Sequence, residues 1–265
     1  MGEISINPKF NIHETYKKVR ILNPYRNASP IGGVDPDYKA VLDYAAGNFI
    51  DLPSAAQQDI DNQFIINYKS SGAWDLDDVV FKFKGTATPA FKLICWKRRI
   101  EAQAFGGLTW SDSGVKGNGT NAYIKSGYIP SATNKWSLND ASVAFSSFAL
   151  NTTGCVAGSY SNSNDSIYVA ARTGTSYFGL NSLLFNTSTD YRLLGYTSYN
   201  RISPSFLTID TTDIASDSGA VIPLEIFILA RSNAGVASIF GDAGLEFVSF
   251  GSSKKSIHNT IKAIF

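Results

Sequence analysis

A long succession of short alternating segments, separated by turn sequences, constrains the fold of this 265-residue chain most strongly. It begins after residue 74 with VVFKFK at 79–84 and FKLICWK at 91–97. Further segments lie at 141–150, 166–171, 177–180, 191–196, 206–210, 224–230 and 245–250, with turns such as NSND at 162–165 and SDSG at 216–219 between them. Many short strands with regularly spaced turns predict a mainly β fold, an antiparallel β-sandwich of the jelly-roll kind.

The stretch GNGTNAYI at 117–124 predicts a tight turn followed by a strand. Gly117 and Gly119 suit backbone positions with φ > 0 on either side of Asn118. Alternation should place Ala122, Ile124, Ser126 and Tyr128 on one face of the strand. The opposite face should carry Tyr123, Lys125 and Gly127. Since neither a helix nor a Lys-Ser/Thr pair follows, the stretch does not match a phosphate-binding loop.

Helical patterns flank the strand-rich part. Residues 36–46 predict a first helix, with Pro36 in its first turn and Gly47 just past its end. A second helix should begin after Ser54, which forms a capping box with Gln57, and should end at Gly72 in a left-handed cap. Its apolar residues recur every four positions and should pack on the main domain: Ile60, Phe64 and Tyr68. A last short helix is expected within 252–265, with Ile257, Ile261 and Ile264 on one side.

Residues 1–35 show no periodicity and combine basic residues with several prolines and glycines. Two interpretations stay open: a solvated arm, or an arm that becomes ordered by docking onto a partner subunit. In the second case the contacts would be Ile12, Tyr16, Val19, Ile21 and Leu22. The chain should therefore comprise an arm at 1–35, a helical segment at 36–73 packed on the main domain, and a jelly roll with its C-terminal helix at 74–265.

The charge balance and apolar content narrow the possible partners. The formal net charge of +1 gives no reason to expect a nucleic-acid partner. No apolar run approaches the ~18 residues of a membrane-spanning helix, and the N-terminus lacks a signal-peptide core. We therefore expect synthesis in a host cytoplasm without membrane insertion. Cys95 and Cys155 form no CxxC or Cys/His pattern and should be buried free thiols.

Candidate catalytic and metal-binding residues are few. The two histidines, His13 and His258, have no partner at metal-ligand spacing, and no G-x-S-x-G sequence is present. Glu225 and Glu246 stand alone between apolar residues, so we expect edge or ion-paired roles for them and not a glycosidase pair. The aspartates of WDLDD at 74–78 lack the glycine and distant glutamate of a calcium loop and should form a solvated turn: Asp75, Asp77 and Asp78. No catalytic residue, metal or cofactor is predicted.

Loops rich in Tyr, Asn, Ser and Gly suit the binding of sugars or proteins. Tyrosine offers a rigid ring at low entropic cost, and Asn and Ser offer adaptable hydrogen bonds. The candidate binding residues are Trp136, Tyr160, Tyr177, Tyr196 and Tyr199. The alternative for each is an aromatic residue of the core or between strands.

The region 108–144 carries a family resemblance. Its sequence, LTWSDSGVKGNGTNAYIKSGYIPSATNKWSLNDASVA, resembles the FTxNQGFTGNGTSAYIDTNFNPAT pattern of phage virion and prophage tail proteins. In those proteins a strand of the form Tyr/Trp-x-Leu-Asn-Asn/Asp-Ala-Ser follows. Similar matches at 52–83, 91–99 and 245–265 extend the resemblance over about 36–265. The chain departs from the pattern at Lys125 and Gly127, where an Asp-Thr-Asn run is common.

The resemblance implies a concanavalin/LamG-like jelly roll in a tail, fibre or spike component, without a shared catalytic motif. We therefore expect a non-enzymatic virion structural protein (tail, spike or capsid-decorating) that could attach to a host surface glycan. Its partners would be other virion proteins, reached through the arm, and further copies of itself. The alternatives are a stand-alone carbohydrate-binding module and, less favoured because the carboxylate pair is missing, a sandwich-fold glycan hydrolase.

Overall fold

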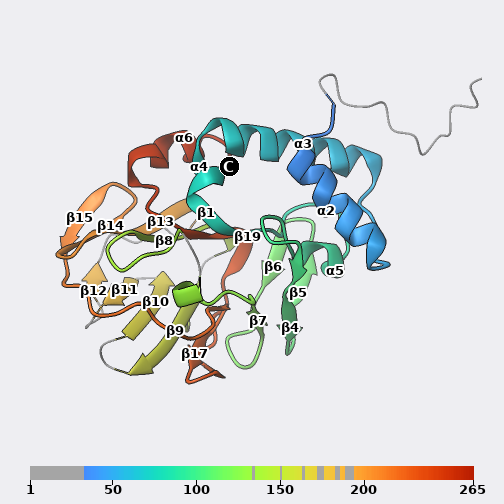
Figure 1. The fold of residues 1–265 in the computed structure, drawn as a ribbon. Helices are drawn as coiled ribbons and strands as arrows, with labels where there is room; N and C mark the ends of the chain where they lie inside the picture. The colour runs from blue at the N-terminus through green and yellow to red at the C-terminus, as the bar shows by residue number, and fades with distance from the viewer. Residues whose placement is uncertain are drawn as a thin grey trace, which may run out of the picture. The chain divides into compact units, whose positions relative to one another are not determined.

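Two stacked β-sheets make up most of the computed structural model, which describes residues 33–132, 135–149, 151–162, 165–171, 176–182, 186–188 and 194–265 (Figure 1). Residues 34–265 form one unit by their internal contacts. Residues 1–32 of the predicted arm lie outside the described residues, and so do its predicted contacts: Ile12, Tyr16, Val19, Ile21 and Leu22.

The eight-stranded sheet has the order β15-β14-β13-β8-β19-β6-β5, and β1 also pairs with β19. Its pairings are antiparallel. Its strands are β1 (Asp77–Lys82), β5 (Thr109–Ser111), β6 (Gly114–Lys116), β8 (Ala141–Ala149), β13 (Gly195–Ser203), β14 (Phe206–Ile209), β15 (Thr212–Ala215) and β19 (Gly244–Gly251).

The nine-stranded sheet has the order β12-β11-β10-β9-β16-β7-β4, and a hairpin of β17 and β18 joins it through β9. Its strands are β4 (Gln103–Phe105), β7 (Tyr123–Lys125), β9 (Ala157–Asn162), β10 (Asp165–Ala171), β11 (Ser176–Ser182), β12 (Asn186–Ser188), β16 (Phe227–Ile228), β17 (Arg231–Asn233) and β18 (Val236–Ser238). Only the β17–β9 pair among these is parallel. A separate hairpin joins β2 (Ile94–Cys95) to β3 (Ile100–Glu101). The predicted antiparallel β-sandwich is confirmed.

Hydrophobic side chains form two main layers. The first lies between the sheets and includes Val143 and Phe145 of the eight-stranded sheet and Val169 and Phe178 of the nine-stranded sheet. The second lies on the outward side of the eight-stranded sheet, where helices cover it. Its members include Tyr38, Val41, Ile65, Tyr68, Val80, Ala144, Tyr196, Phe247 and Ile261. Figure 1 shows α3 and α6 on this side of the sandwich, away from β9, β10 and β17.

Two helices, α2 and α3, begin and end close to where local signals predicted. They are α2 (Pro36–Gly47), α3 (Ala55–Ser70), α4 (Ala73–Leu76), α5 (Pro89–Lys92) and α6 (His258–Lys262), with 3-10 turns at Pro130–Ala132 and Lys255–Ile257. Ser54 caps α3 by accepting a hydrogen bond from the Gln57 amide, and Gly72 adopts φ +81° after the helix. Tyr68 is buried as predicted, but Ile60 is 59 % exposed. A spacing of four residues advances 400° in an α-helix, so each step drifts about 40° away from the packed face.

Several expected elements were wrong in extent. The strand expected between the GNG turn and Pro130 is reduced to Tyr123–Lys125, and the strand expected at 191–196 is observed as Gly195–Ser203. The strand predicted at 91–97 is reduced to Ile94–Cys95, because Thr88 caps a short helix that has Pro89 at its first position. The strand predicted at 224–230 is reduced to Phe227–Ile228, because Leu229 adopts φ +62°. The C-terminal helical part begins only at Lys255, since Ser252 extends its hydroxyl to the Lys135 carbonyl oxygen. Cys95 and Cys155 are buried and free, as predicted.

The GNG turn is built around the side chain of Asn118. Its Oδ1 accepts hydrogen bonds at 3.0 Å from the backbone amides of Thr120, Asn121 and Ala122. Gly119 adopts φ +72°, whereas Gly117 is required by a close approach: a Cβ there would lie 2.1 Å from the Gly241 carbonyl oxygen. The strand that follows buries the residues predicted for its core side: Ala122, Ile124, Ser126 and Tyr128.

The solvated turn expected at 74–78 is wrong for Asp77. Its carboxylate lies 2.6 Å from the Lys254 ammonium, and both side chains are fully buried. The Tyr68 hydroxyl donates to the same carboxylate at 2.5 Å. Burial raises the pKa of Asp77, and the charge of Lys254 opposes that rise. Asp78 is also engaged, since it accepts from the Tyr128 hydroxyl at 3.0 Å.

Replacing Lys254 should leave the buried Asp77 carboxylate without its counter-charge. We expect Lys254→Met to lower the free energy of unfolding, measured by urea titration, by about 3–5 kcal/mol. The control is Lys39→Met, which removes an exposed pair with Asp43 and should cost at most about 0.5 kcal/mol. Equal effects of the two substitutions would show that the buried pair does not hold the fold.

Candidate functional site

Three of the five aromatic residues predicted as binding residues are buried, so that prediction is wrong for them. Trp136 is 3 % exposed and donates its Nε1 proton to Asn181 Oδ1 at 3.0 Å. Tyr199 is fully buried between the sheets, 5.5 Å from the Phe178 ring centroid. Tyr196 is 2 % exposed and stacks on Phe265 at 5.3 Å. Their rings belong to the two hydrophobic layers and cannot contact a ligand at the surface.

Tyr160 and Tyr177 are partly exposed, and the nine-stranded sheet brings them to its outward side. They lie on β9 and β11, the two neighbours of β10. On β10 and β11 the residues alternate with the buried Val169 and Phe178, so Tyr168 and Tyr177 point away from the core. Tyr168, Tyr177 and Ile239 form a small cluster with Cys155 outside the main core.

A second group of aromatic rings lies on the same sheet, on β4, β7 and β16. Phe105 and Tyr123 stack with ring centroids 4.9 Å apart, and Tyr123 stacks on Phe227 at 5.3 Å. Phe105 is 36 % exposed and lies on the edge strand β4. Together the two groups form what we call the aromatic face: Phe105, Tyr123, Lys125, Tyr160, Tyr168, Tyr177, Phe227 and Arg231. Tyr168 and Phe227 are buried, at 6 % and 1 % exposed, and the others are at least partly exposed.

Two cations rest on the rings of the aromatic face. The Lys125 ammonium lies 5.4 Å from the Phe105 centroid and 5.6 Å from that of Phe227. The Arg231 guanidinium lies 4.9 Å from the Tyr160 centroid and 5.8 Å from that of Tyr168. Both contacts fall within the range of cation–π attraction. Within the described part of the chain, neither cation forms an ion pair.

Gly158 makes room for Arg231 to reach the tyrosines. It pairs with Tyr168 on one side and with both Phe227 and Arg231 on the other. A Cβ at this position would lie 3.3 Å from Arg231 Cγ and 2.9 Å from Cys155 Sγ. The arginine stem therefore lies over a position where the sheet has no side chain.

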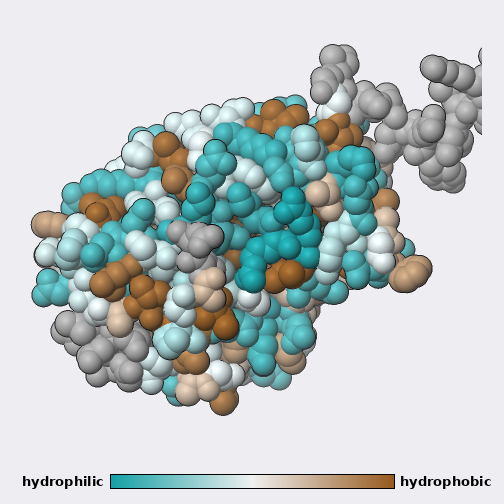
Figure 2. Space-filling view, in the orientation of Figure 1, coloured by the Kyte–Doolittle hydropathy of each residue, from teal (hydrophilic) through white to brown (hydrophobic). Residues whose placement is uncertain are grey.

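The aromatic face is on the side of the sandwich opposite the helices. Helices contribute to the hydrophobic layer on the eight-stranded sheet, whereas the cluster around Tyr168 contains residues of strands and connecting segments, with none from a described helix. Figure 2 shows hydrophobic residues in separate patches among hydrophilic ones on the face it draws. The aromatic residues on the outward side of the nine-stranded sheet are therefore not there to pack against a described helix.

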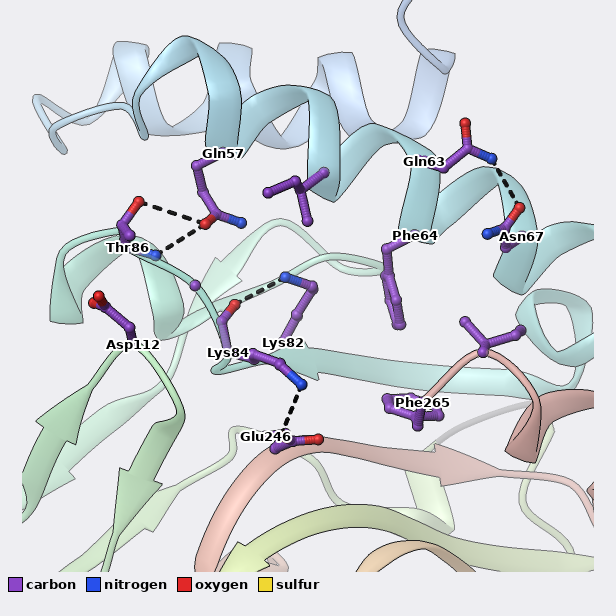
Figure 3. A pocket seen from close by; sticks show the side chains of 13 residues that line it. Gln57, Gln63, Phe64, Asn67, Lys82, Lys84, Thr86, Asp112, Glu246 and Phe265 are labelled. Atoms are coloured by element: carbon purple, nitrogen blue, oxygen red, sulfur yellow. Dashed lines mark hydrogen bonds and ion pairs between the residues drawn. The ribbon is translucent and has the colours of Figure 1, made fainter.

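A pocket of about 510 Å³ lies beneath α3, against β1 and β19 and the C-terminal residues (Figure 3). Its polar groups are bonded mainly to one another. The Lys84 ammonium lies 2.9 Å from Glu246 Oε1, and the Gln63 amide donates to Asn67 Oδ1 at 2.8 Å. Lys82 lies 2.6 Å from Asp61. Burial raises the pKa of Asp61, and the charge of Lys82 offsets only part of that rise. A polar ligand would have to compete with these bonds, so the pocket is the weaker candidate.

The carboxylates considered from the sequence have structural partners. Glu246 pairs with Lys84 and accepts a hydrogen bond from the Ser146 hydroxyl at 2.9 Å, which confirms its expected ion-paired role. Glu225 accepts a hydrogen bond from the Gly127 amide at 2.7 Å.

His258 lies buried, with Nδ1 3.0 Å from the Ser198 hydroxyl oxygen. The described ranges contain no group of three or more His, Cys, Asp or Glu placed to hold a metal ion. No helix among the described residues has the length and apolar character needed to cross a membrane.

Sequence reasoning missed several residues of the aromatic face. Phe105, Phe227 and Arg231 lie on strands of two or three residues, which are too short to display alternation. The available signal was the alternation after the GNG turn, which placed Tyr123 and Lys125 on the outward side.

No protein-family model matches the chain, and no curated sequence matches it. Among solved structures, Trypanosoma rangeli sialidase is 9 % identical with a TM-score of 0.44, over 76 % of this chain and 38 % of that one. Domain 4 of AbnA, an arabinanase from Geobacillus stearothermophilus solved with arabinotriose, is 12 % identical with a TM-score of 0.41, over 68 % and 99 %. The NanB sialidase of Streptococcus pneumoniae is 9 % identical with a TM-score of 0.39, and the chain spans 27 % of its length. These likenesses are too low to bear on ligand or activity.

Adding a side chain at Gly158 should disturb the aromatic face. A Cβ would lie 2.9 Å from Cys155 Sγ and 3.0 Å from the Ile167 carbonyl oxygen, so we expect Gly158→Ala to lower the free energy of unfolding by about 1–3 kcal/mol. Gly47→Ala is the matched control, because it has open space around it and should be neutral or stabilising by up to about 1 kcal/mol. Urea titration of both variants provides the measurement. Wild-type stability of Gly158→Ala would contradict the close packing of Cys155 and Ile167 around this position.

Proposed function

We propose that this protein is a non-enzymatic carbohydrate-binding β-sandwich and that the aromatic face is its glycan-binding surface. The observation that carries the proposal is the set of aromatic side chains on the outward side of the nine-stranded sheet, where no described helix contributes to the hydrophobic cluster. Aromatic residues at the surface that folding does not require are typical of interaction sites.

The chemistry of the aromatic face suits a sugar. The C–H faces of a pyranose pack against aromatic rings, while its hydroxyls need hydrogen-bond partners close by. Phe105 supplies a partly exposed ring at the sheet edge. Tyr123 and Tyr160 combine a ring with a hydroxyl that makes no hydrogen bond to a described residue, and tyrosine loses little conformational entropy on binding.

The same surface supports binding over hydrolysis. A glycosidase uses two carboxyl groups on either side of the scissile bond. The residues that define the aromatic face include no carboxylate, and Glu246 in the pocket is held by Lys84 and Ser146. A sugar on the aromatic face would meet neither an acid nor a nucleophile from these side chains.

We further propose, on the resemblance over residues 36–265, that the protein is carried on a bacteriophage particle as a tail, spike or capsid-decorating component. The arm at 1–35 would attach it to other virion proteins, and the sandwich would face outward. The most specific part of the resemblance, the GNG turn, serves the backbone through Asn118 and Gly119. The GNG turn therefore supports the fold, whereas the proposed glycan-binding role rests on the aromatic face.

Removing one exposed ring should weaken glycan binding without unfolding the protein. On a glycan array, we expect wild-type protein to bind and Phe105→Ala to lose about tenfold or more in affinity. Phe206→Ala is the control, because Phe206 is 45 % exposed on β14 of the other sheet and should bind as wild type. Absence of any signal at millimolar protein would argue against the proposal.

The virion assignment predicts a place on the particle. An antibody raised against residues 36–265 should label purified phage particles at the tail, the spike or the capsid surface when imaged by electron microscopy. A phage lacking this chain provides the control for the label. Unlabelled particles that lack the protein by mass spectrometry would remove this assignment and leave the glycan proposal standing.

A further inference from the structure

We infer that the ligand of the aromatic face is an acidic glycan, one that carries carboxylate or sulfate groups, and that Lys125 and Arg231 bind those groups. The inference rests on the proposed function and names the class of glycan. It begins from the charges of the face: its two charged residues are both cations, although acidic and basic residues are nearly balanced over the chain, at 22 and 23.

Neither cation is paired with a carboxylate of the described residues, whereas several other lysines and arginines are. Lys39, Lys69, Lys84, Arg99 and Lys255 each lie within 3.1 Å of a carboxylate at the surface. Lys82 and Lys254 are paired in the interior. By contrast, the only attractive partners that the described residues offer Lys125 and Arg231 are aromatic rings. The positive charge of the face is therefore left for a ligand.

The side chains of Lys125 and Arg231 are held in place before a ligand binds. The side chain of Arg231 lies across Gly158 on the tyrosines, and its Nε is buried without a hydrogen-bond partner in the described structure. A guanidinium is a planar donor that matches the oxygens of a carboxylate or sulfate. Because the rings hold both cations against the sheet, less side-chain freedom is lost when an anion binds.

The two cations lie on the same outward side of the nine-stranded sheet. Lys125 pairs with Phe227, and Phe227 and Arg231 both pair with Gly158 from the side opposite Tyr168. Phe227 and Gly158 are themselves buried. An acidic glycan on this face would therefore meet the two cations and the partly exposed rings beside them, those of Phe105, Tyr123 and Tyr160.

The test compares matched acidic and neutral glycans by titration calorimetry. The probes are a polyuronate with its carboxyl-reduced form and a sulfated glycan with its desulfated form, which distinguishes the two sources of negative charge. We expect wild-type protein to bind at least one acidic form about tenfold or more tighter than its neutral counterpart. The preference should fall steeply at about 1 M salt, where the screening length is about 3 Å.

The variants are Lys125→Gln and Arg231→Gln, each of which should lower the affinity for the acidic form about tenfold more than the affinity for the neutral form. Lys116→Gln is the control, because Lys116 is exposed on β6 of the other sheet and should bind as wild type. Thermal unfolding of each variant confirms that it is folded.

The outcomes separate this inference from the proposed function. Equal binding of acidic and neutral forms overturns the inference while the glycan-binding proposal stands. Absence of binding to all four glycans overturns both. Binding of single-stranded DNA as tight as that of the acidic glycan would show that charge alone is recognised, and it also overturns the inference.

Discussion

The buried ion pair between Asp77 and Lys254 joins two segments that are far apart in the chain. Asp77 begins β1, and Lys254 follows β19, the strand with which β1 pairs. Tyr68 extends the contact into α3 through its hydroxyl. Each charge would be costly to bury alone, so the strand register and the position of α3 must be satisfied together. The pair therefore links the position of α3 to the pairing of β1 with β19.

Covering one sheet gives outward-facing aromatic residues different roles on the two sides of the sandwich. On the eight-stranded sheet, the outward residues Tyr196 and Phe247 lie against Phe265 at the C-terminal end and are buried. On the nine-stranded sheet, Tyr123 and Tyr160 also face outward, but they remain partly exposed. The same alternation thus produces a helix interface on one sheet and a candidate binding surface on the other.

This difference limits what could be predicted from the sequence. The alternation with period two is local, so it correctly placed Ile124 and Tyr128 inward and Tyr123 and Lys125 outward. Capping by Ser54 is equally local and was also predicted. Whether an outward tyrosine is covered depends on contacts between distant segments. The sequence therefore predicts a binding role for Tyr196 although α6 and Phe265 bury it, and it does not identify Arg231, because the strand of Arg231 has only three residues.

Cations on a sheet can also serve to prevent edge-to-edge aggregation, and this function would place them on edge strands. The edge strands of the nine-stranded order are β4 and β12, whose sequences QAF and NTS contain no charge. Lys125 lies one strand inside the edge, and Arg231 lies on β17 between β9 and β18. Edge protection therefore does not account for their positions. Their positions over aromatic rings, without carboxylate partners in the described structure, are better explained by an anionic ligand.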